Sequence, residues 1–368
     1  MKRQDKKVSR WIGIALAAVL FIAWALLWPL NSYIEAPGSA SNLRSFVQVK
    51  GHPDKGKGSF MITSVALQQA RPATYVMAKL VPYMSIESAD DVTGGQNSAT
   101  FDRVQKFYMQ SSINEAIAVA YQAAHQPVSK KYLGIYVLQV QPNSQFKKAI
   151  RVGDTITKVN GHHFNTAQGY QKYIGRQKVG TPLTVTYQRD GKTHTTTHKL
   201  VKLTGSRAGI GIMLTNNMKV TTKTPVKVNP GQLGGPSGGL MFTLQIYQQI
   251  SGHDLQKGRK IAGTGTIDAN GQVGEIGGID KKIIAAHRAG ATVFFAPYVK
   301  PTKLLLKYED GHQTNYQLAK KTAKKYAPGM EVVPVTSFKQ AVHYLETTEY
   351  SNKSMVIKNV TMDFCVFK

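Results

Sequence analysis

Cysteine, tryptophan and acidic residues are scarce in this sequence, and the shortages exclude several classes of protein. The single cysteine, Cys365, can form no disulfide within the chain and no cysteine-based zinc site. Only three tryptophans occur, and no segment repeats at intervals of about 20–50 residues, which argues against a propeller or a solenoid. The ten histidines show no His-Glu-x-x-His or other paired-ligand spacing, so the sequence predicts no metal. Hydrophobic residues still make up 42% of the chain, enough for packed cores.

Acidic side chains are outnumbered by basic ones, 20 against 47, which leaves a net charge of +27. In a cytoplasmic protein such a charge would suggest nucleic-acid binding. The lysines are scattered, however, and no RNP-like or zinc-finger pattern accompanies them. We therefore expect a basic surface that faces an anionic cell envelope, and no nucleic-acid partner.

The N-terminal region joins a basic segment to a long uncharged one. Residues 1–10 are rich in lysine and arginine, and no charge occurs from Trp11 to Ile34. The run Trp11–Leu30 is long enough to cross ~30 Å of hydrocarbon as a helix, whereas a cleavable signal has an apolar core of only about 7–15 residues. The pattern predicts a cytoplasmic tail over 1–10, a single transmembrane anchor over 11–34 and an extracytoplasmic remainder. Cleavage around Gly38–Ala40 is the alternative.

The segment after the anchor mixes turn-rich and periodic stretches. Residues 31–60 are rich in glycine, serine, proline and lysine, and are typical of a linker that turns into a strand. Gly58–Leu67 has the composition of a strand, and Ile113–His125 has the apolar spacing of a helix. Beyond residue 132 the pattern predicts strands over 135–140, 152–160 and 183–189, a helix over 167–177 and a hairpin turn at Asp190–Gly191.

The C-terminal part has the organisation of an α+β or α/β domain. We expect helices over 237–250, 279–289, 316–326 and 338–346, and strands over 226–229, 291–296 and 330–335.

One serine in this part stands out because four glycines surround it. Ser237 lies within Gly234-Gly235-Pro236-Ser237-Gly238-Gly239, at the start of an apolar helix. A nucleophile there would have an exposed hydroxyl and free backbone N–H groups nearby. A helix N-cap is the plain structural alternative. The motif also matches the G-x-S-x-G elbow of α/β-hydrolases, which would need a preceding strand and a later acid and histidine such as Asp280 with His287 or His343.

A lysine on the helix expected at 279–289 lies beside the apolar stripe. At 100° per residue, Ile279, Ile283 and Ala286 form that stripe, and Lys282 lies at its edge. We expect Lys282 to be partly buried, and Lys281 and Arg288 to lie in solvent on the far side. Burial lowers a lysine pKa and makes the amine a general base, while a snorkelling lysine is the alternative.

The serine motif, the triplet Thr264-Gly265-Thr266 and the run from Gly274 to Gly290 resemble the proteolytic domain of the Lon family in order and spacing. One departure is Thr266, where the family has an acidic residue. Another is Gly234, where an aspartate often precedes the motif.

This resemblance implies a role for each matching residue. Ser237 is the implied nucleophile, Lys282 its general base, and Thr264 the residue that orients the lysine amine. Backbone N–H groups of Ser237 and Gly238 are the implied oxyanion hole.

Another part of the chain resembles a PDZ domain of the bacterial protease-associated kind. The resemblance rests on Leu133-Gly134-Ile135, on Pro142-Asn143-Ser144 and on Val152-Gly153-Asp154. It implies that Leu133, Gly134 and Ile135 form the loop that captures a peptide carboxylate while the peptide adds a strand. A PDZ unit that only positions other parts is the alternative.

The complete layout resembles the membrane-anchored PDZ–Lon serine proteases of Gram-positive bacteria. It implies that 43–126 and 205–346 fold together as a split Lon-type domain, with a PDZ domain inserted over 128–204. Residues 347–368 match nothing that we can place.

The resemblance implies a serine endopeptidase that cleaves exported peptides or flexible protein segments, and it leaves room for a homo-oligomer. No cofactor is expected, because the nearest match to a Walker A loop, Gly51–Gly58, lacks the final Ser or Thr that binds Mg²⁺. The enzyme would then act without ATP. A non-catalytic PDZ scaffold is the rival interpretation, and an α/β-hydrolase is a third.

Overall fold

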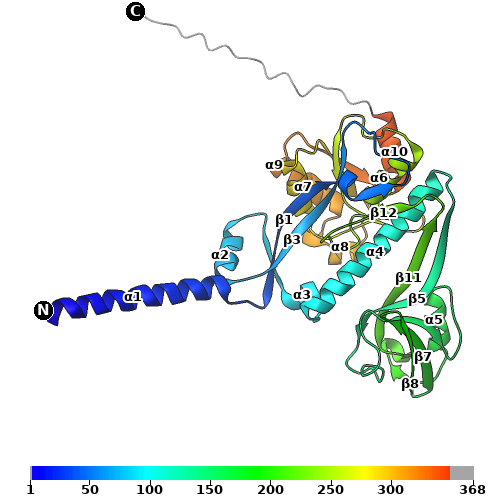
Figure 1. Cartoon of the computed structure of the whole chain (residues 1–368), viewed down its shortest axis with the longest axis horizontal. Helices are drawn as coiled ribbons and strands as arrows, with labels where there is room; N and C mark the ends of the chain where they lie inside the picture. Colours follow the sequence, from blue (N-terminus) through cyan, green and yellow to red (C-terminus); the bar gives the residue numbers. More distant parts are fainter. Residues whose placement is uncertain (1, 349–368) are drawn as a thin grey trace, which may run out of the picture.

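The computed structural model describes residues 2–348. It begins with helix α1, Lys2–Leu27, which projects from the rest of the molecule (Figure 1). The window Arg10–Leu27 is long and apolar enough to cross a membrane, and none of it is buried inside the protein. A signal sequence can have the same length and apolar composition. The helix is therefore a candidate membrane span.

A six-stranded sheet forms the centre of the larger lobe, in the order β17-β16-β13-β3-β1-β4. Strands β3, β13, β16 and β17 are parallel, and β1 runs antiparallel to both β3 and β4. The parallel pair β3–β13 joins a strand early in the chain to one about 200 residues later, with Phe60 opposite Ile261. The strands are β1 Ser32–Asn42, β3 Ser59–Gln69, β4 Ser85–Ser88, β13 Lys260–Gly263, β16 Val293–Pro297 and β17 Glu331–Val335.

Helices cover both faces of this sheet. Because side chains alternate along a strand, Phe60 and Ile62 of β3 pack on one face with α4, α6 and α10, whereas Met61 packs on the other with α7 and α9. Strand β16 is buried throughout, as expected of a strand covered on both sides. The helices are α4 Ser98–Ala123, α6 Gly239–Ser251, α7 Ile279–Arg288, α9 Asn315–Tyr326 and α10 Phe338–Thr347.

A second sheet, with its own hydrophobic core, forms the smaller lobe seen in green in Figure 1. Its five strands lie in the order β11-β5-β6-β7-β8. The hairpin turn predicted at Asp190–Gly191 is confirmed, since both residues have positive φ and Arg189 pairs with Lys192. The elements are β5 Val128–Val140, β6 Thr155–Val159, α5 Ala167–Gly175, β7 Pro182–Arg189, β8 Lys192–Lys199 and β11 Ile212–Thr222.

Short elements complete the two lobes. They are η1 Leu43–Ser45, β2 Val47–Val49, α2 Pro72–Leu80, α3 Ala89–Thr93, β9 Val201–Lys202, η2 Thr204–Ser206, β10 Ala208–Gly209, β12 Val226–Val228, β14 Thr266–Ile267, β15 Val273–Gly274, α8 Lys303–Tyr308 and η3 Asp310–His312.

Three boundaries expected from the sequence are wrong. Much of 31–60 is not a linker, because β1 and β2 lie within it. Strand β1 lacks a clean period of two because it has a bulge between Pro37 and Ala40, where a Cβ on Gly38 would lie 2.6 Å from the carbonyl oxygen of Ser64. Helix α1 ends at Leu27, so the helix does not extend over the whole range 11–34 that was expected to span the membrane.

The third boundary is the start of the helix expected from Ile113. Helix α4 begins at Ser98, where the side chain of Asn97 caps it by accepting a hydrogen bond from the Thr100 amide. The expected tail over 347–368 lies outside the described residues from position 349 onward.

Candidate active site

Ser237 lies in the glycine-rich turn that leads into α6, and neighbouring elements hold this turn in place. The Gly235 amide donates to the Gln105 carbonyl of α4 (3.0 Å), and the Ser112 hydroxyl of α4 donates to the Pro236 carbonyl (2.8 Å). A Cβ on Gly239 would lie 2.8 Å from the backbone nitrogen of Ile267, so only glycine allows α6 to start this close to β14. The turn leaves Ser237 partly exposed.

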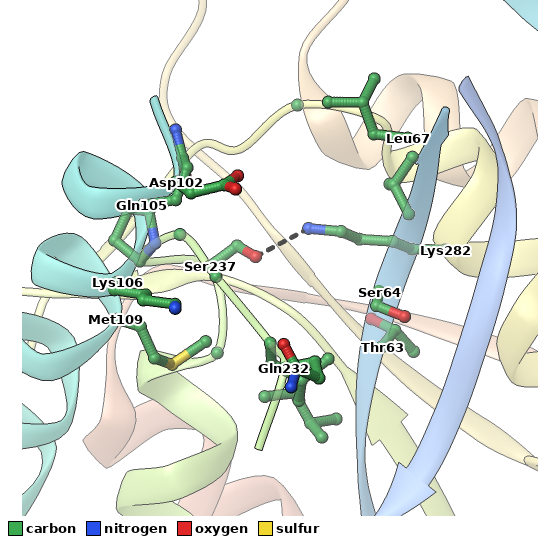
Figure 2. A pocket seen from close by; sticks show the side chains of 18 of the residues that line it. Thr63, Ser64, Leu67, Asp102, Gln105, Lys106, Met109, Gln232, Ser237 and Lys282 are labelled. Atoms are coloured by element: carbon green, nitrogen blue, oxygen red, sulfur yellow. Dashed lines mark hydrogen bonds between the residues drawn. The ribbon is translucent and has the colours of Figure 1, made fainter. Parts of the chain in front are cut away.

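The Lys282 amine of α7 reaches Ser237 across the site. Its Nζ lies 2.9 Å from Ser237 Oγ and 3.2 Å from Thr264 Oγ1, both within hydrogen-bond distance. Figure 2 shows the lysine side chain extending toward the serine hydroxyl. The side chain of Lys282 is only 4% exposed. The structure therefore brings together two residues that lie far apart in the sequence.

Burial changes the acid–base chemistry of this amine. Loss of water lowers the pKa of Lys282 from 10.5 to about 7, and the charge of Glu35 opposes part of that effect. A substantial fraction of the amine is therefore uncharged near neutral pH. An uncharged amine beside a serine hydroxyl can accept its proton.

Thr264 connects the lysine to the serine backbone. It follows directly after β13 and is fully buried, and its hydroxyl donates to the Ser237 carbonyl (3.0 Å). The next residue reinforces this contact, because the Gly265 amide donates to the same carbonyl (2.8 Å). The position of Thr264 thus holds the lysine amine and the serine turn in one arrangement.

The expectation for Lys281 is wrong. It is 6% exposed rather than in solvent, and its Nζ lies 3.2 Å from Asp280 and 3.8 Å from Glu35. The helical pattern predicted one buried stripe, but β1 packs against a further side of α7 and covers Lys281. Lys282 is likewise more buried than its position at the edge of the stripe implied. Arg288 is exposed as expected and lies over the ring of Tyr83.

A cavity of about 670 Å³ opens in front of Ser237 and Lys282. Strand β3 lines one side with Thr63 and Ser64, and α4 lines another with Gln105 and Met109 (Figure 2). Its lining contains no histidine among the described residues, and a turn rather than a strand leads into Ser237. The arrangement therefore lacks the two features that an α/β-hydrolase site needs.

Three residues near the site were not singled out in the sequence. Ser112 and Gln105 lie on α4 and hold the serine turn, and Glu35 of β1 influences the lysine. Ser112 is a polar residue in the apolar half of α4, which is a weak signal of a specific contact. Glu35 gave no signal, because its segment resembles a linker.

The loop expected at Leu133–Ile135 is not a loop. These residues lie within β5, which is hydrogen-bonded to β11 on one side and to β6 on the other, and Ile135 is fully buried. Gly134 has φ +144°, and a Cβ there would collide with the Ile156 carbonyl of β6. This glycine therefore lies at an irregular point within a strand. In the sequence alone, such a glycine cannot be told from a glycine in a loop.

Strand β11 forms one edge of the same sheet, and α4 contacts part of it, because the Asn114 side chain donates to the Met218 carbonyl (2.9 Å). Helix α5 lies beside the same strand, with the Ala167 amide donating to the Asn216 side chain (2.9 Å). An edge strand next to a helix offers unpaired backbone groups to an extended peptide.

Comparison with known families assigns both lobes. The model of the Lon protease C-terminal proteolytic domain matches residues 193–305, which include Ser237, Thr264 and Lys282. The model of the PDZ domain matches residues 110–200. The chain carries a PDZ domain and a Lon-type proteolytic domain. This combination fits a PDZ/Lon-type protease family and supports a serine protease.

Individual relatives match over short stretches. A Lon protease of Desulfosudis oleivorans is 39% identical over 69 residues, which is 19% of this chain and 8% of the relative. The periplasmic serine endoprotease DegP of Escherichia coli is 42% identical over 60 residues, 16% of this chain and 13% of the relative. The PDZ domain of the SdrC-like protein from Listeria monocytogenes is 30% identical, with 23% of this chain and 90% of that chain covered and a TM-score of 0.22. The chain thus spans only 8% of the Lon protease and 13% of DegP.

Proposed function

We propose that this protein is a membrane-anchored, extracytoplasmic serine endopeptidase that uses Ser237 and Lys282 and needs no ATP. One observation carries the proposal: a buried amine with a pKa of about 7 lies 2.9 Å from a partly exposed serine hydroxyl in a Lon-type domain. The substrates are exported peptides or flexible protein segments, because the chain has no nucleotide-driven unfolding machinery to prepare a folded protein.

In the first chemical step, Ser237 Oγ attacks the carbonyl carbon of the scissile peptide bond. The uncharged Lys282 Nζ accepts the hydroxyl proton as the new C–O bond forms. Lys282 then returns the proton to the leaving amine, and the C–N bond breaks to give an acyl-enzyme. A water molecule then gives up a proton to Lys282 and attacks the ester carbonyl carbon. The C–O bond to Ser237 breaks, and Lys282 returns the proton to Ser237 Oγ, which releases the second product and regenerates the free enzyme.

The negative oxygen of the tetrahedral intermediate needs hydrogen-bond donors. The backbone N–H groups of Ser237 and Gly238 fit this role, because neither donates to another group in residues 2–348 and both lie where α6 begins. Thr264 acts as a positioning residue that orients the Lys282 amine.

For the domain organisation, we propose that a segment around 43–126 and a second segment that begins after β11 form one proteolytic domain with the PDZ domain inserted. The PDZ domain extends past the expected end at 204 to about 222, because β11 belongs to its sheet. The pairing of β3 with β13 supports this division, and β1 extends the first segment back to Ser32. Helix α1 is the proposed anchor, with its basic end in the cytoplasm.

The PDZ domain captures substrate in this proposal, but not at Leu133–Ile135. The edge of β11 beside α5 is the place where a peptide can add as a strand.

Peptide cleavage by the full-length chain tests the proposed activity. Detergent-solubilised protein is incubated with a library of unstructured peptides with and without ATP, and products are identified by mass spectrometry. We expect cleavage by the wild type that ATP does not change, and none by Ser237→Ala. Binding of peptides without cleavage by any form would favour the non-catalytic PDZ scaffold.

A further inference from the structure

Helix α2 has apolar side chains on two opposite faces, and within residues 2–348 only one of these faces packs against other side chains. On the inner face, Ala78 and Tyr75 pack into a small cluster with Ile34 and Ala70. On the outer face, Val76, Met77 and Leu80 are 59%, 48% and 78% exposed. Residues 76, 77 and 80 lie within about 100° on a helical wheel, so they form one continuous apolar stripe.

The position of α2 relative to α1 gives this stripe its context. The Arg71 side chain at the start of α2 donates to the Leu26 carbonyl (2.8 Å), and the Leu30 amide donates to the Ala70 carbonyl (2.8 Å). Helix α2 therefore packs against the last turn of α1 (Figure 1). The 18-residue apolar window Arg10–Leu27 is about 27 Å long as a helix, close to the hydrocarbon thickness of a bilayer. In a spanning α1, its C-terminal end and α2 would lie at the same boundary of the membrane.

Exposed large hydrophobic side chains are concentrated around this junction. Apart from those on α1, Trp28, Leu67 and the α2 stripe, the described residues include only Val179, Met213 and Leu304 as exposed large hydrophobics. These three lie in separate parts of the structure, with Val179 between α5 and β7, Met213 on β11 and Leu304 on α8. The apolar surface that continues from α1 onto α2 is therefore not typical of the rest of the molecule.

We propose that α2 is an interfacial helix whose outer face, Val76, Met77 and Leu80, inserts into the outer leaflet of the membrane that α1 spans. The inference rests on the proposed anchoring by α1. Two features fit a lipid surface in particular. Exposed Lys79 lies next to the stripe and can pair with lipid phosphates, and the Trp28 side chain lies exposed just beyond α1. An amphipathic face with a basic residue at its edge is typical of helices that lie in the plane of the membrane surface.

Insertion of α2, as a second attachment to the membrane besides α1, would hold the active site at a defined height above the lipid surface. Strand β3 runs from Gln69, beside α2, to Ser64 at the wall of the catalytic cavity. Five residues of extended strand span at most about 17 Å. A freely swinging single anchor would allow a range of heights and tilts, whereas α1 and α2 together would keep the cavity within about 20 Å of the lipid surface.

Depth-dependent fluorescence quenching in vesicles tests the insertion of α2. In a full-length Cys365→Ser background, single cysteines are introduced by Leu80→Cys, by Leu20→Cys in α1 and by Met213→Cys in β11, and each is labelled with the fluorophore NBD. Met213 is the matched control, since it is also an exposed apolar residue at 54%. The vesicles contain phosphatidylethanolamine and phosphatidylglycerol. One set carries a nitroxide on a shallow acyl position of a tracer lipid, and a second set carries it on a deep acyl position.

We expect quenching at position 80 to be several-fold stronger than at position 213. Quenching at position 80 equal to that at 213, with position 20 strongly quenched by deep nitroxides, would overturn the insertion of α2 and leave the anchor intact. Absence of quenching at position 20 as well would overturn the anchor itself, and the inference with it.

A second variant tests whether the stripe drives insertion. With the label introduced by Met77→Cys, the double substitution Val76→Ser/Leu80→Ser should lower the quenching at position 77 several-fold. Both side chains are exposed, so the fold does not depend on them. Unchanged quenching would show that the apolar stripe is not the cause of insertion and would overturn the proposal.

Discussion

Lys282 Nζ and Ser237 Oγ lie 2.9 Å apart, although the two residues come from different elements separated by 45 positions in the chain. Ser237 is held by the turn before α6, and Lys282 by α7 on the other face of the sheet. The lysine side chain reaches Ser237 beyond the carboxyl end of β13, where its amine contacts the Thr264 hydroxyl. The site therefore depends on both layers of helices and on the sheet between them.

Removal of the amine should abolish catalysis without altering the cavity much. Replacing a general base costs about 10²–10⁴-fold in rate, so we expect a loss in kcat of at least that order for Lys282→Met. Burst kinetics with an ester substrate measure the acylation step directly. Lys281→Met is the control, because that neighbouring lysine is similarly buried but pairs with Asp280 and Glu35 instead. An equal loss in both variants would contradict a specific role for Lys282.

The rate should depend on pH with an acid limb near the pKa of Lys282. Protonation removes the base, so kcat/KM should fall about tenfold per pH unit below about 7 and level off above it. Glu35 stabilises the charged amine and raises its pKa, so Glu35→Gln should move the limb to lower pH. A limb that stays in place in Glu35→Gln, and also in the residual activity of Lys282→Met, would assign the titration to another group.

The buried lysine should also lower the stability of the fold. Its pKa is about 7 when folded and 10.5 when unfolded, so the unfolded chain binds more protons between these values and stability rises with pH there. The penalty is absent above pH 10.5 and reaches its full size below pH 7. We expect Lys282→Met to raise the Tm at pH 7 by several degrees.

Thermal unfolding followed by circular dichroism tests this expectation. The gap between variant and wild type should shrink as the pH is raised from 7 toward 10. A difference in Tm that does not change with pH would show that side-chain packing, rather than the charge of Lys282, explains it.

The hydrogen bond from Ser112 to the turn that carries Ser237 should support catalysis, although Ser112 does not line the cavity. Ser112→Ala removes the 2.8 Å hydrogen bond to the Pro236 carbonyl, a loss of about 0.5–1.5 kcal/mol. A turn held less firmly should lower kcat by about 2–10-fold with little change in KM, since Ser112 does not line the cavity. Ser111→Ala on the neighbouring position of α4 serves as the control. A rise in KM alone would contradict a role in positioning Ser237.

Local patterns in the sequence predicted several elements of both lobes. The glycines around Ser237, the apolar stripe of 279–289 and the turn at Asp190–Gly191 all correspond to elements of the structure. They do so because turns and helix faces depend on residues a few positions apart. The two matched domain families agree with the resemblance read from the motifs.

Other features depend on segments that lie far apart in the chain. Lys281 is buried because β1 covers α7, and Leu133–Ile135 forms a strand because β11 and β6 pair with β5 on either side. Strand β1 itself has no clear pattern, since its bulge and small residues follow the shape of β3. A local sequence pattern does not show which distant segment will pack against it or pair with it.

By itself, the sequence determined which residue types are available for the chemistry and where the apolar helix at the N-terminus lies. Only the tertiary structure decided that a buried, partly neutral amine meets the Ser237 hydroxyl, because the pKa of Lys282 depends on what removes water from it. It also decided that the outer face of α2 is exposed in the described part of the chain, because burial is a property of the packed chain and hydrophobicity is a property of the residue.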